Sequence, residues 1–269
     1  MNRAVYNQLV KIIYDKSGIT LNDNKVTLVS ARIAKRMRVL GVEESSDYLR
    51  VILEDDTGEE IIHLLDAIST NVTRFLREPD HFELLKQLVC QWLSDGQRQF
   101  RFWSAGCSSG EEPYTIGMTV LDAMGDARIN QRILATDIST RILKECLRGE
   151  YVSVKVKDVP AAWRAKYFEQ EGRGRDALFR IKDIVKRLIV FRRLNLSVTP
   201  FPMRGPMDAI FCRNVMIYFD TAVRKNLLDE FIRLLKPGGY LFVGHSESLT
   251  GFVSTLRCVH PSVYIKPAG

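Results

Sequence analysis

The sequence predicts an α/β protein with a mostly parallel sheet, helices on both faces, an all-helical N-terminal domain and a small antiparallel β insertion. Three observations predict it. Apolar residues recur at helical spacing through the first 80 residues. From about residue 99, short apolar runs alternate with helical patterns, which is typical of a parallel sheet. Alternating runs near 165–190 break that rhythm. We expect a helical domain at 1–80 and a sheet domain at 81–269 that carries the insertion.

The helical domain is predicted from three amphipathic segments. The first carries its apolar stripe over residues 5–13 and ends at Gly18. The second is expected to begin with an N-cap near 22–23 and to end at Gly41. The third runs from Thr57 to Ile68. No alternating pattern occurs in this region, so we expect helices alone.

The sheet domain is predicted from short apolar runs, and helical patterns follow the first three of them. The expected strands lie at 100–105, 131–137, 208–212, 240–243 and 262–266. In the insertion, Pro160 suits the first turn of a short helix through Trp163. The alternating runs 177–182 and 184–192 are expected to be its antiparallel strands.

Composition limits the class of protein. The chain is 46% hydrophobic and 26% charged, which is ordinary for a globular protein. No apolar run approaches the ~20 residues that span a bilayer, and the first residues lack a signal-peptide pattern. The five cysteines are irregularly spaced and the four histidines form no ligand pattern, so we expect a cytoplasmic protein without a metal. The net charge of +7 fits either nucleic acid or an acidic protein surface.

The turn at 104–110 is the first candidate binding site. Its small residues, with Ala105 and Gly106 among them, follow the first strand and open directly into a helix. Small side chains let backbone approach a ligand, and the helix N-terminus offers N–H groups. A tight strand–helix corner is the alternative. Asp137 ends the second strand, where a carboxylate binds ribose hydroxyls in nucleotide sites. Its alternative role is a helix N-cap, for which Ser139 is also placed.

The late part of the chain narrows the nature of the ligand. A Pro-Gly-Gly turn at 237–239 precedes the expected strand 240–243 and is similar to the connection before the sixth strand of class I methyltransferases. The strand 262–266 would be their antiparallel seventh. This resemblance implies S-adenosylmethionine as the ligand. Glu111 and Glu112 then suit the cation of its methionyl group, although acids in a first turn also complement the helix dipole.

Five motifs occur in one order along the chain: NVTRFLRE at 71–78, SAGCSSGEEPY at 104–114, ATDI at 135–138, FCRNVMIYF at 211–219 and GHSE at 244–247. Together they resemble the CheR family, methyltransferases that esterify glutamates on bacterial chemoreceptors. The resemblance runs from the N-terminal helices to the last strand. It implies that 81–269 is a methyltransferase domain that converts S-adenosylmethionine to S-adenosylhomocysteine without a metal.

The resemblance also implies which residues serve the reaction. Arg77 and Tyr218 would face the methyl-transfer centre; the alternatives are a surface ion pair of Arg77 with Glu78 or Asp80 and a core position for Tyr218. The implied cofactor contacts are Asn71, Thr73, Arg77, Glu112, Asp137, Asn195, Leu196, Cys212, Arg213 and Asn214.

The expected chemistry agrees with these residue types. A glutamate side chain has a pKa of about 4.3, so its carboxylate needs no strong general base at neutral pH. Placing it against an activated methyl donor is chiefly a proximity effect. An arginine fork and a tyrosine hydroxyl can hold a carboxylate.

The substrate is expected to dock on the second helix. Its basic residues are Lys25, Arg32, Lys35, Arg36 and Arg38, with no acid between Asn24 and Val42. The alternative is that these charges only form a solvent-exposed face of the helix. The resemblance implies an acidic cytoplasmic helical bundle of methyl-accepting chemoreceptors as partner, so we expect Arg32, Arg36 and Arg38 to meet it at receptor arrays on the inner membrane.

Some family members also bind a receptor's C-terminal peptide at the edge of the β insertion. Gly172 and Gly174 are present in the loop concerned, but Ala177 stands where that pattern has a basic residue, which puts tether binding in doubt.

Three other functions remain as alternatives. A nucleic-acid methyltransferase would suit the basic charge, but the segment 213–216 lacks the paired prolines of enzymes that methylate base amino groups. A cofactor-binding module without turnover would not need the full motif set. A nicotinamide oxidoreductase is disfavoured because the turn is not G-x-G-x-x-G and lies about 30 residues before Asp137, rather than ~20. We therefore expect neither a nucleic-acid partner nor a membrane-spanning segment.

Overall fold

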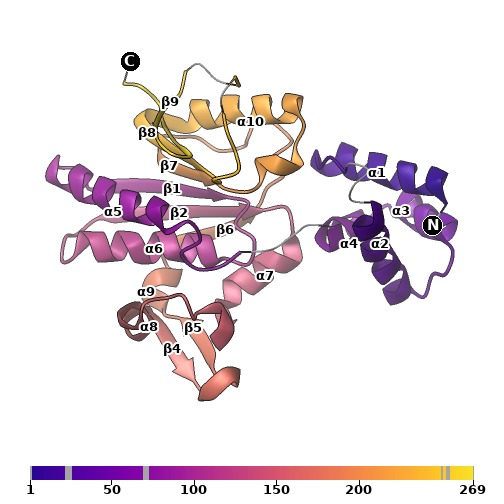
Figure 1. The fold of residues 1–269 in the computed structure, drawn as a ribbon, viewed down its shortest axis with the longest axis horizontal. Coiled ribbons are helices and arrows are strands. Elements are labelled where there is room, and N and C mark those ends of the chain that lie inside the picture. The colour runs from indigo at the N-terminus through magenta and orange to yellow at the C-terminus, as the bar shows by residue number, and fades with distance from the viewer. Residues whose placement is uncertain (1, 22–25, 69–72, 250, 253–254, 269) are drawn as a thin grey trace.

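The computed structural model describes residues 2–21, 26–68, 73–249, 251–252 and 255–268, and within them it has a helical domain, a seven-stranded sheet and a three-stranded sheet. Figure 1 shows the helical domain at one side of the large sheet and the small sheet projecting from the same body. The predicted class, with a mostly parallel sheet and an all-helical N-terminal part, is confirmed.

The helical domain packs its helices around one apolar core. They are α1 (Arg3–Ser17), α2 (Val26–Leu40), α3 (Ser45–Glu54) and α4 (Glu59–Ile68). Gly18 ends α1 with a φ of 68°, a left-handed conformation that favours glycine. Leu9, Ile33 and Leu64 are buried together with other apolar residues of these helices. The expected N-cap of α2 lies outside the described residues, and the sequence pattern had indicated no helix at α3.

The large sheet has the strand order β6-β2-β1-β7-β8-β10-β9. The first five of these run parallel, and β10 is antiparallel to β8 and to β9, as expected for the closing strand. The strands are β1 (Gln99–Ala105), β2 (Asn130–Asp137), β6 (Ile189–Arg193), β7 (Met207–Cys212), β8 (Leu235–Val243), β9 (Arg257–His260) and β10 (Val263–Ile265).

Helices cover both faces of this sheet because successive strand residues point to opposite sides. On β1, Phe102 packs with α5 (Pro79–Ser94) and α6 (Glu111–Met124). The next residue, Trp103, packs with α10 (Thr221–Leu234), and its ring lies 5.3 Å from that of Phe231. In Figure 1, α10 lies on one side of the strands and α5 and α6 on the other.

The small sheet differs from the expected insertion. Its strands, in the order β3-β5-β4, are β3 (Glu150–Val152), β5 (Leu178–Ile181) and β4 (Phe168–Glu171), and α8 (Ala161–Tyr167) leads into β4. The run 184–192, expected to be one of its strands, was assigned wrongly. It contains α9 (Asp183–Lys186) and then β6, which pairs parallel with β2 and buries Ile189 and Phe191 in the main core.

The strand order creates a crevice at one edge of the sheet. From β1 the chain passes to β2 and β6 on one side, by way of α7 (Thr140–Arg148), and then to β7 and β8 on the other. Ligands of open α/β sheets bind at such a reversal, outside the carboxyl ends of the strands. The reversal lies between β1, which ends at Ala105, and β7, which ends at Cys212. The neighbouring strand β2 ends at Asp137.

Candidate active site

A cavity of about 340 Å³ lies at this crevice, between the carboxyl ends of the strands and the helical domain. Most residues proposed from the sequence line it: Thr73, Arg77, Gly106, Glu112, Asp137, Asn195, Leu196, Arg213, Asn214, Tyr218 and Arg32. Ala105 and Cys212 are fully buried in β1 and β7 behind the cavity and do not line it. Asn71 lies outside the described residues.

The glycine turn after β1 is fixed by hydrogen bonds to β2. The N–H groups of Gly106 and Cys107 both donate to the carbonyl oxygen of Thr136, at 2.8 and 2.9 Å. These two donors are therefore used within the protein and fix the turn against β2. Gly106 has a φ of 84°, and a Cβ added there would lie 2.5 Å from Cγ2 of Val215. The turn thus requires glycine both for its conformation and for packing against the loop after β7.

Asp137 anchors the same turn. Its carboxylate accepts the N–H of Ser108 at 2.8 Å and that of Ser139 at 3.0 Å. Burial raises the pKa of Asp137, while these backbone bonds act in the opposite direction. The N-cap of α7 is Ser139, whose Oγ accepts the N–H of Ile142. Because a carboxylate has about four lone-pair sites, Asp137 keeps acceptor capacity for hydroxyls of a ligand.

Arg213 is the charged centre of the cavity wall. Its side chain is 2% exposed and pairs with Glu78 at 3.1 Å and with Glu112 at 3.2 Å. It also donates to the carbonyl oxygen of Arg77 and lies over the ring of Phe82. Burial raises the pKa of Glu112, and the Arg213 charge opposes that shift. The guanidinium therefore neutralises two carboxylates whose side chains are only 12% and 13% exposed, and it holds the backbone at Arg77.

The two adjacent glutamates in the first turn of α6 have different surroundings. Glu112 lines the cavity and accepts the hydroxyl of Ser104 at 2.7 Å. Glu111 is fully buried and pairs with Lys155 at 2.9 Å. Lys155 also donates to the carbonyl oxygen of Thr73. Glu112 can therefore meet a ligand, whereas Glu111 links α6 to the loop that carries Thr73.

Arg77 and Tyr218 both line the cavity and are partly exposed. The carboxylate of Glu78 pairs with Arg213, and that of Asp80 lies 3.1 Å from Nε2 of His245. Tyr218 ends the short 3-10 turn Met216–Tyr218, and its carbonyl oxygen accepts the N–H of Thr20. The segment that follows α1 is thereby attached to this wall.

Glu247 was not assigned a role from the sequence, although it lies in the GHSE motif. It is buried, and its carboxylate accepts the N–H groups of Gly244 and Asn214, each at 2.7 Å, and of Ile217 at 3.2 Å. Asn214 has a φ of 59°, and a Cβ on Gly244 would lie 2.6 Å from its Nδ2. One carboxylate thus fixes the cavity segment that runs from Asn214 towards Tyr218.

The basic residues of α2 separate into different roles. Arg36 has a side chain 17% exposed and pairs with Glu60, which also accepts the hydroxyl of Tyr48 at 2.8 Å. Arg32 lines the cavity and donates to the carbonyl oxygen of Ile68. Arg38 is exposed. Among the residues proposed for docking, Arg36 is therefore held inside the helical domain. In the described part of the chain, no helix is long and apolar enough to cross a membrane.

Comparison with known proteins agrees with this architecture. Residues 4–69 match the model of the CheR methyltransferase all-alpha domain, and residues 71–265 match that of the CheR methyltransferase SAM binding domain. The chain is 40% identical over 268 residues to a chemotaxis protein methyltransferase of Borreliella burgdorferi, covering 97% of this chain and 93% of that protein. It is 35% identical over 250 residues to the chemotaxis protein methyltransferase of Escherichia coli, covering 93% and 86%. The chain therefore belongs to the CheR family of S-adenosylmethionine-dependent methyltransferases.

Proposed function

We propose that this enzyme transfers a methyl group from S-adenosylmethionine to glutamate side chains of chemoreceptors in the cytoplasm, as a protein-glutamate O-methyltransferase of sensory adaptation. One observation carries the proposal. A single cavity is lined by carboxylates suited to the donor, Glu112 and Asp137, and by an arginine and a tyrosine suited to a carboxylate acceptor, Arg77 and Tyr218.

The polar groups of the cavity fit S-adenosylmethionine. Oγ of Ser108 and Oδ1 of Asn214 are buried at the cavity and have no hydrogen-bond partner among the described residues. Such groups ordinarily find a partner in a ligand or in water. Glu112 is placed to accept from an ammonium group, and Asp137 to accept from ribose hydroxyls. Asn195 and Leu196 line the same space beyond β6.

The residues of the chain would act by positioning. S-adenosylmethionine supplies an activated methyl group on a positively charged sulfur. Because the acceptor carboxylate is already ionised at neutral pH, Arg77 and Tyr218 need only bind and orient it. Arg213 supports this arrangement, since it holds the carbonyl oxygen of Arg77 and the carboxylate of Glu112 together.

We further propose that the receptor's acidic helical bundle meets the exposed side of α2. Lys35 and Arg38 are exposed there, and Arg32 lies at the cavity. Electrostatic attraction of this kind raises association rates more than it stabilises the complex. A receptor tail peptide could add a strand at the free edge of β4, although Ala177 stands where the tethering pattern has a basic residue. Calorimetry with such a peptide tests this second contact.

The proposal is tested with radiolabelled S-adenosylmethionine, a receptor cytoplasmic fragment and the variants Arg77→Ala and Arg77→Lys. We expect transfer by the wild type, loss of at least about 100-fold in turnover with Arg77→Ala, and partial recovery with Arg77→Lys. Unfolding midpoints of both variants should stay near that of the wild type. Turnover by Arg77→Ala close to the wild-type value would contradict the assignment.

A further inference from the structure

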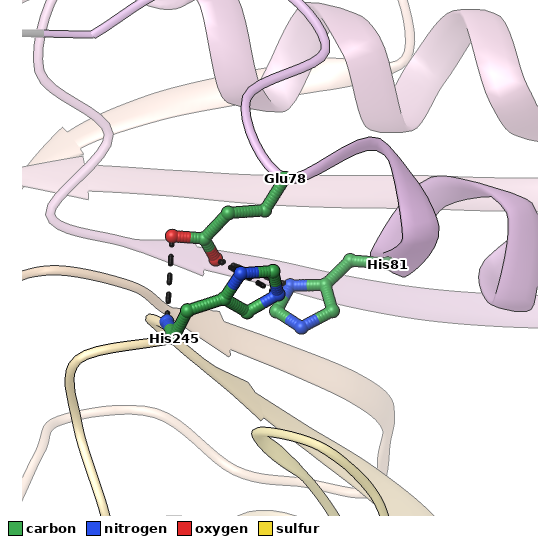
Figure 2. Close-up of side chains that lie close together, drawn as sticks. All are labelled: Glu78, His81 and His245. Carbon is green, nitrogen blue, oxygen red and sulfur yellow. Dashed lines mark hydrogen bonds and ion pairs between the residues drawn. The ribbon is translucent and has the colours of Figure 1, made fainter.

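Behind the cavity wall, the first turn of α5 meets the loop that follows β8. His81 lies in the first turn of α5, and Glu78 is the residue before that helix. His245 lies in the loop after β8. Figure 2 shows the three side chains converging, and their candidate ligand atoms all lie within 4.8 Å of one another. From the sequence we expected no metal, because His81 and His245 are far apart along the chain and show no ligand spacing.

We propose that Glu78, His81 and His245 form a site for a divalent transition metal of the zinc class, with Asp80, which lies beside His245, as the candidate for a fourth, tetrahedral ligand. The site would join α5 to the loop after β8 and would stabilise the cavity wall. It does not depend on the proposed substrate, and its test uses no measurement of methyl transfer.

The distances between the donor atoms fit such a site. Nδ1 of His81 lies 3.6 Å from Oε2 of Glu78, and that oxygen lies 4.0 Å from Nε2 of His245. Nε2 of His245 lies 3.1 Å from Oδ2 of Asp80. In a tetrahedron with metal–ligand bonds of ~2.0–2.1 Å, neighbouring ligand atoms are roughly 3.4 Å apart. These three separations lie within about 0.6 Å of that value, and the ligand atoms of Glu78, His81 and His245 are close enough to converge on one ion.

His81 gives an independent indication of a ligand. Its side chain is 1% exposed, and neither ring nitrogen has a hydrogen-bond partner among the described residues. Leaving such a group unsatisfied is costly, and native structures usually avoid it. An imidazole nitrogen is the commonest metal ligand in proteins.

The neighbouring charges are compatible with a dication. Arg213 contacts Glu78, so a metal on that carboxylate would have a cation near it. Three carboxylates, those of Glu78, Asp80 and Glu112, surround the same region and offset this repulsion. A hydrogen bond from a guanidinium to a ligating carboxylate is an ordinary way to orient a metal ligand. Asp80 and His245 are partly exposed and leave an entry path from solvent.

The site is tested by titrating the metal-stripped full-length protein with cobalt(II) and following the visible absorption typical of tetrahedral coordination, then displacing it with zinc. We expect one equivalent to bind, His245→Ala and His81→Phe to weaken binding at least tenfold, and zinc to raise the unfolding midpoint of the wild type but not of these two variants. His63→Ala, at an exposed position on α4, is the matched control and should bind normally.

Two controls separate binding at this site from misfolding of a variant and from binding by cysteines. His245 has a half-exposed side chain, so His245→Ala tests the site even if the His81 variant does not fold. Cys90 and Cys258 are exposed and could bind zinc by themselves, so the Cys90→Ser/Cys258→Ser protein must retain the cobalt spectrum. No stoichiometric binding, binding that survives His245→Ala, or binding lost with the two cysteines would each overturn the proposal.

Discussion

Replacing Arg213 with methionine should destabilise the protein strongly. The guanidinium is 2% exposed and is the partner of two carboxylates, at 3.1 Å from Glu78 and 3.2 Å from Glu112. At such separations, two unit charges interact by ~5 kcal/mol at an effective dielectric constant near 20. Removing one partner of a buried ion pair costs about 3–5 kcal/mol, because the other charge stays buried without compensation. We expect Arg213→Met to lower the free energy of unfolding by that amount.

Urea unfolding of three variants measures this effect. Lys86→Met is the control, because the Lys86–Asp122 pair has a similar distance, 2.7 Å, but side chains 42% and 26% exposed. That change should cost less than about 1 kcal/mol. Arg213→Met/Glu112→Gln should recover part of the Arg213→Met loss, since the neutral amide removes one unpaired charge. A loss in Arg213→Met no larger than in Lys86→Met would refute the account of this network.

Three further predictions follow from the geometry of the site. Gly106→Ala should weaken S-adenosylmethionine binding at least tenfold in calorimetry, whereas Gly96→Ala, with a similar φ but open space around it, should bind normally. Glu247→Gln should lower the free energy of unfolding by about 1–3 kcal/mol, because its amide cannot accept all the N–H groups that the carboxylate holds; an unchanged urea midpoint would contradict this. Arg36→Ala should destabilise the fold, while Arg38→Ala should leave stability within about 0.5 kcal/mol and raise KM for the receptor; equal effects of the two on stability would contradict the separation of roles.

Local patterns in the sequence were sufficient to place the main features of the site. A strand followed by small residues predicts where backbone can approach a ligand, and Asp137 was placed at the end of its strand by the apolar run before it. Both features now line one cavity. The class of fold followed from the same strand–helix alternation, because parallel strands bring their carboxyl ends to one edge.

Other features depended on contacts that no local pattern contains. Arg213 and Glu78 are more than 130 positions apart, so their pairing appears only once β7 lies beside β1 and α5 covers them. The run of basic residues on α2 does not show that Arg36 forms a buried ion pair with Glu60 inside the helical domain. The run 184–192 alternates as a strand should, but alternation does not say which sheet a strand joins. Only its last part is a strand, and that strand pairs with β2 in the large sheet.

The central claim is tested most directly by mass spectrometry of a chemoreceptor cytoplasmic fragment after incubation with this enzyme and S-adenosylmethionine. The account predicts one added methyl group on each modified glutamate side chain, removed by mild base as an ester must be, and modification at least about 100-fold slower with Arg77→Ala. Methylation that resists base, or that lies on residues other than glutamate, would contradict it.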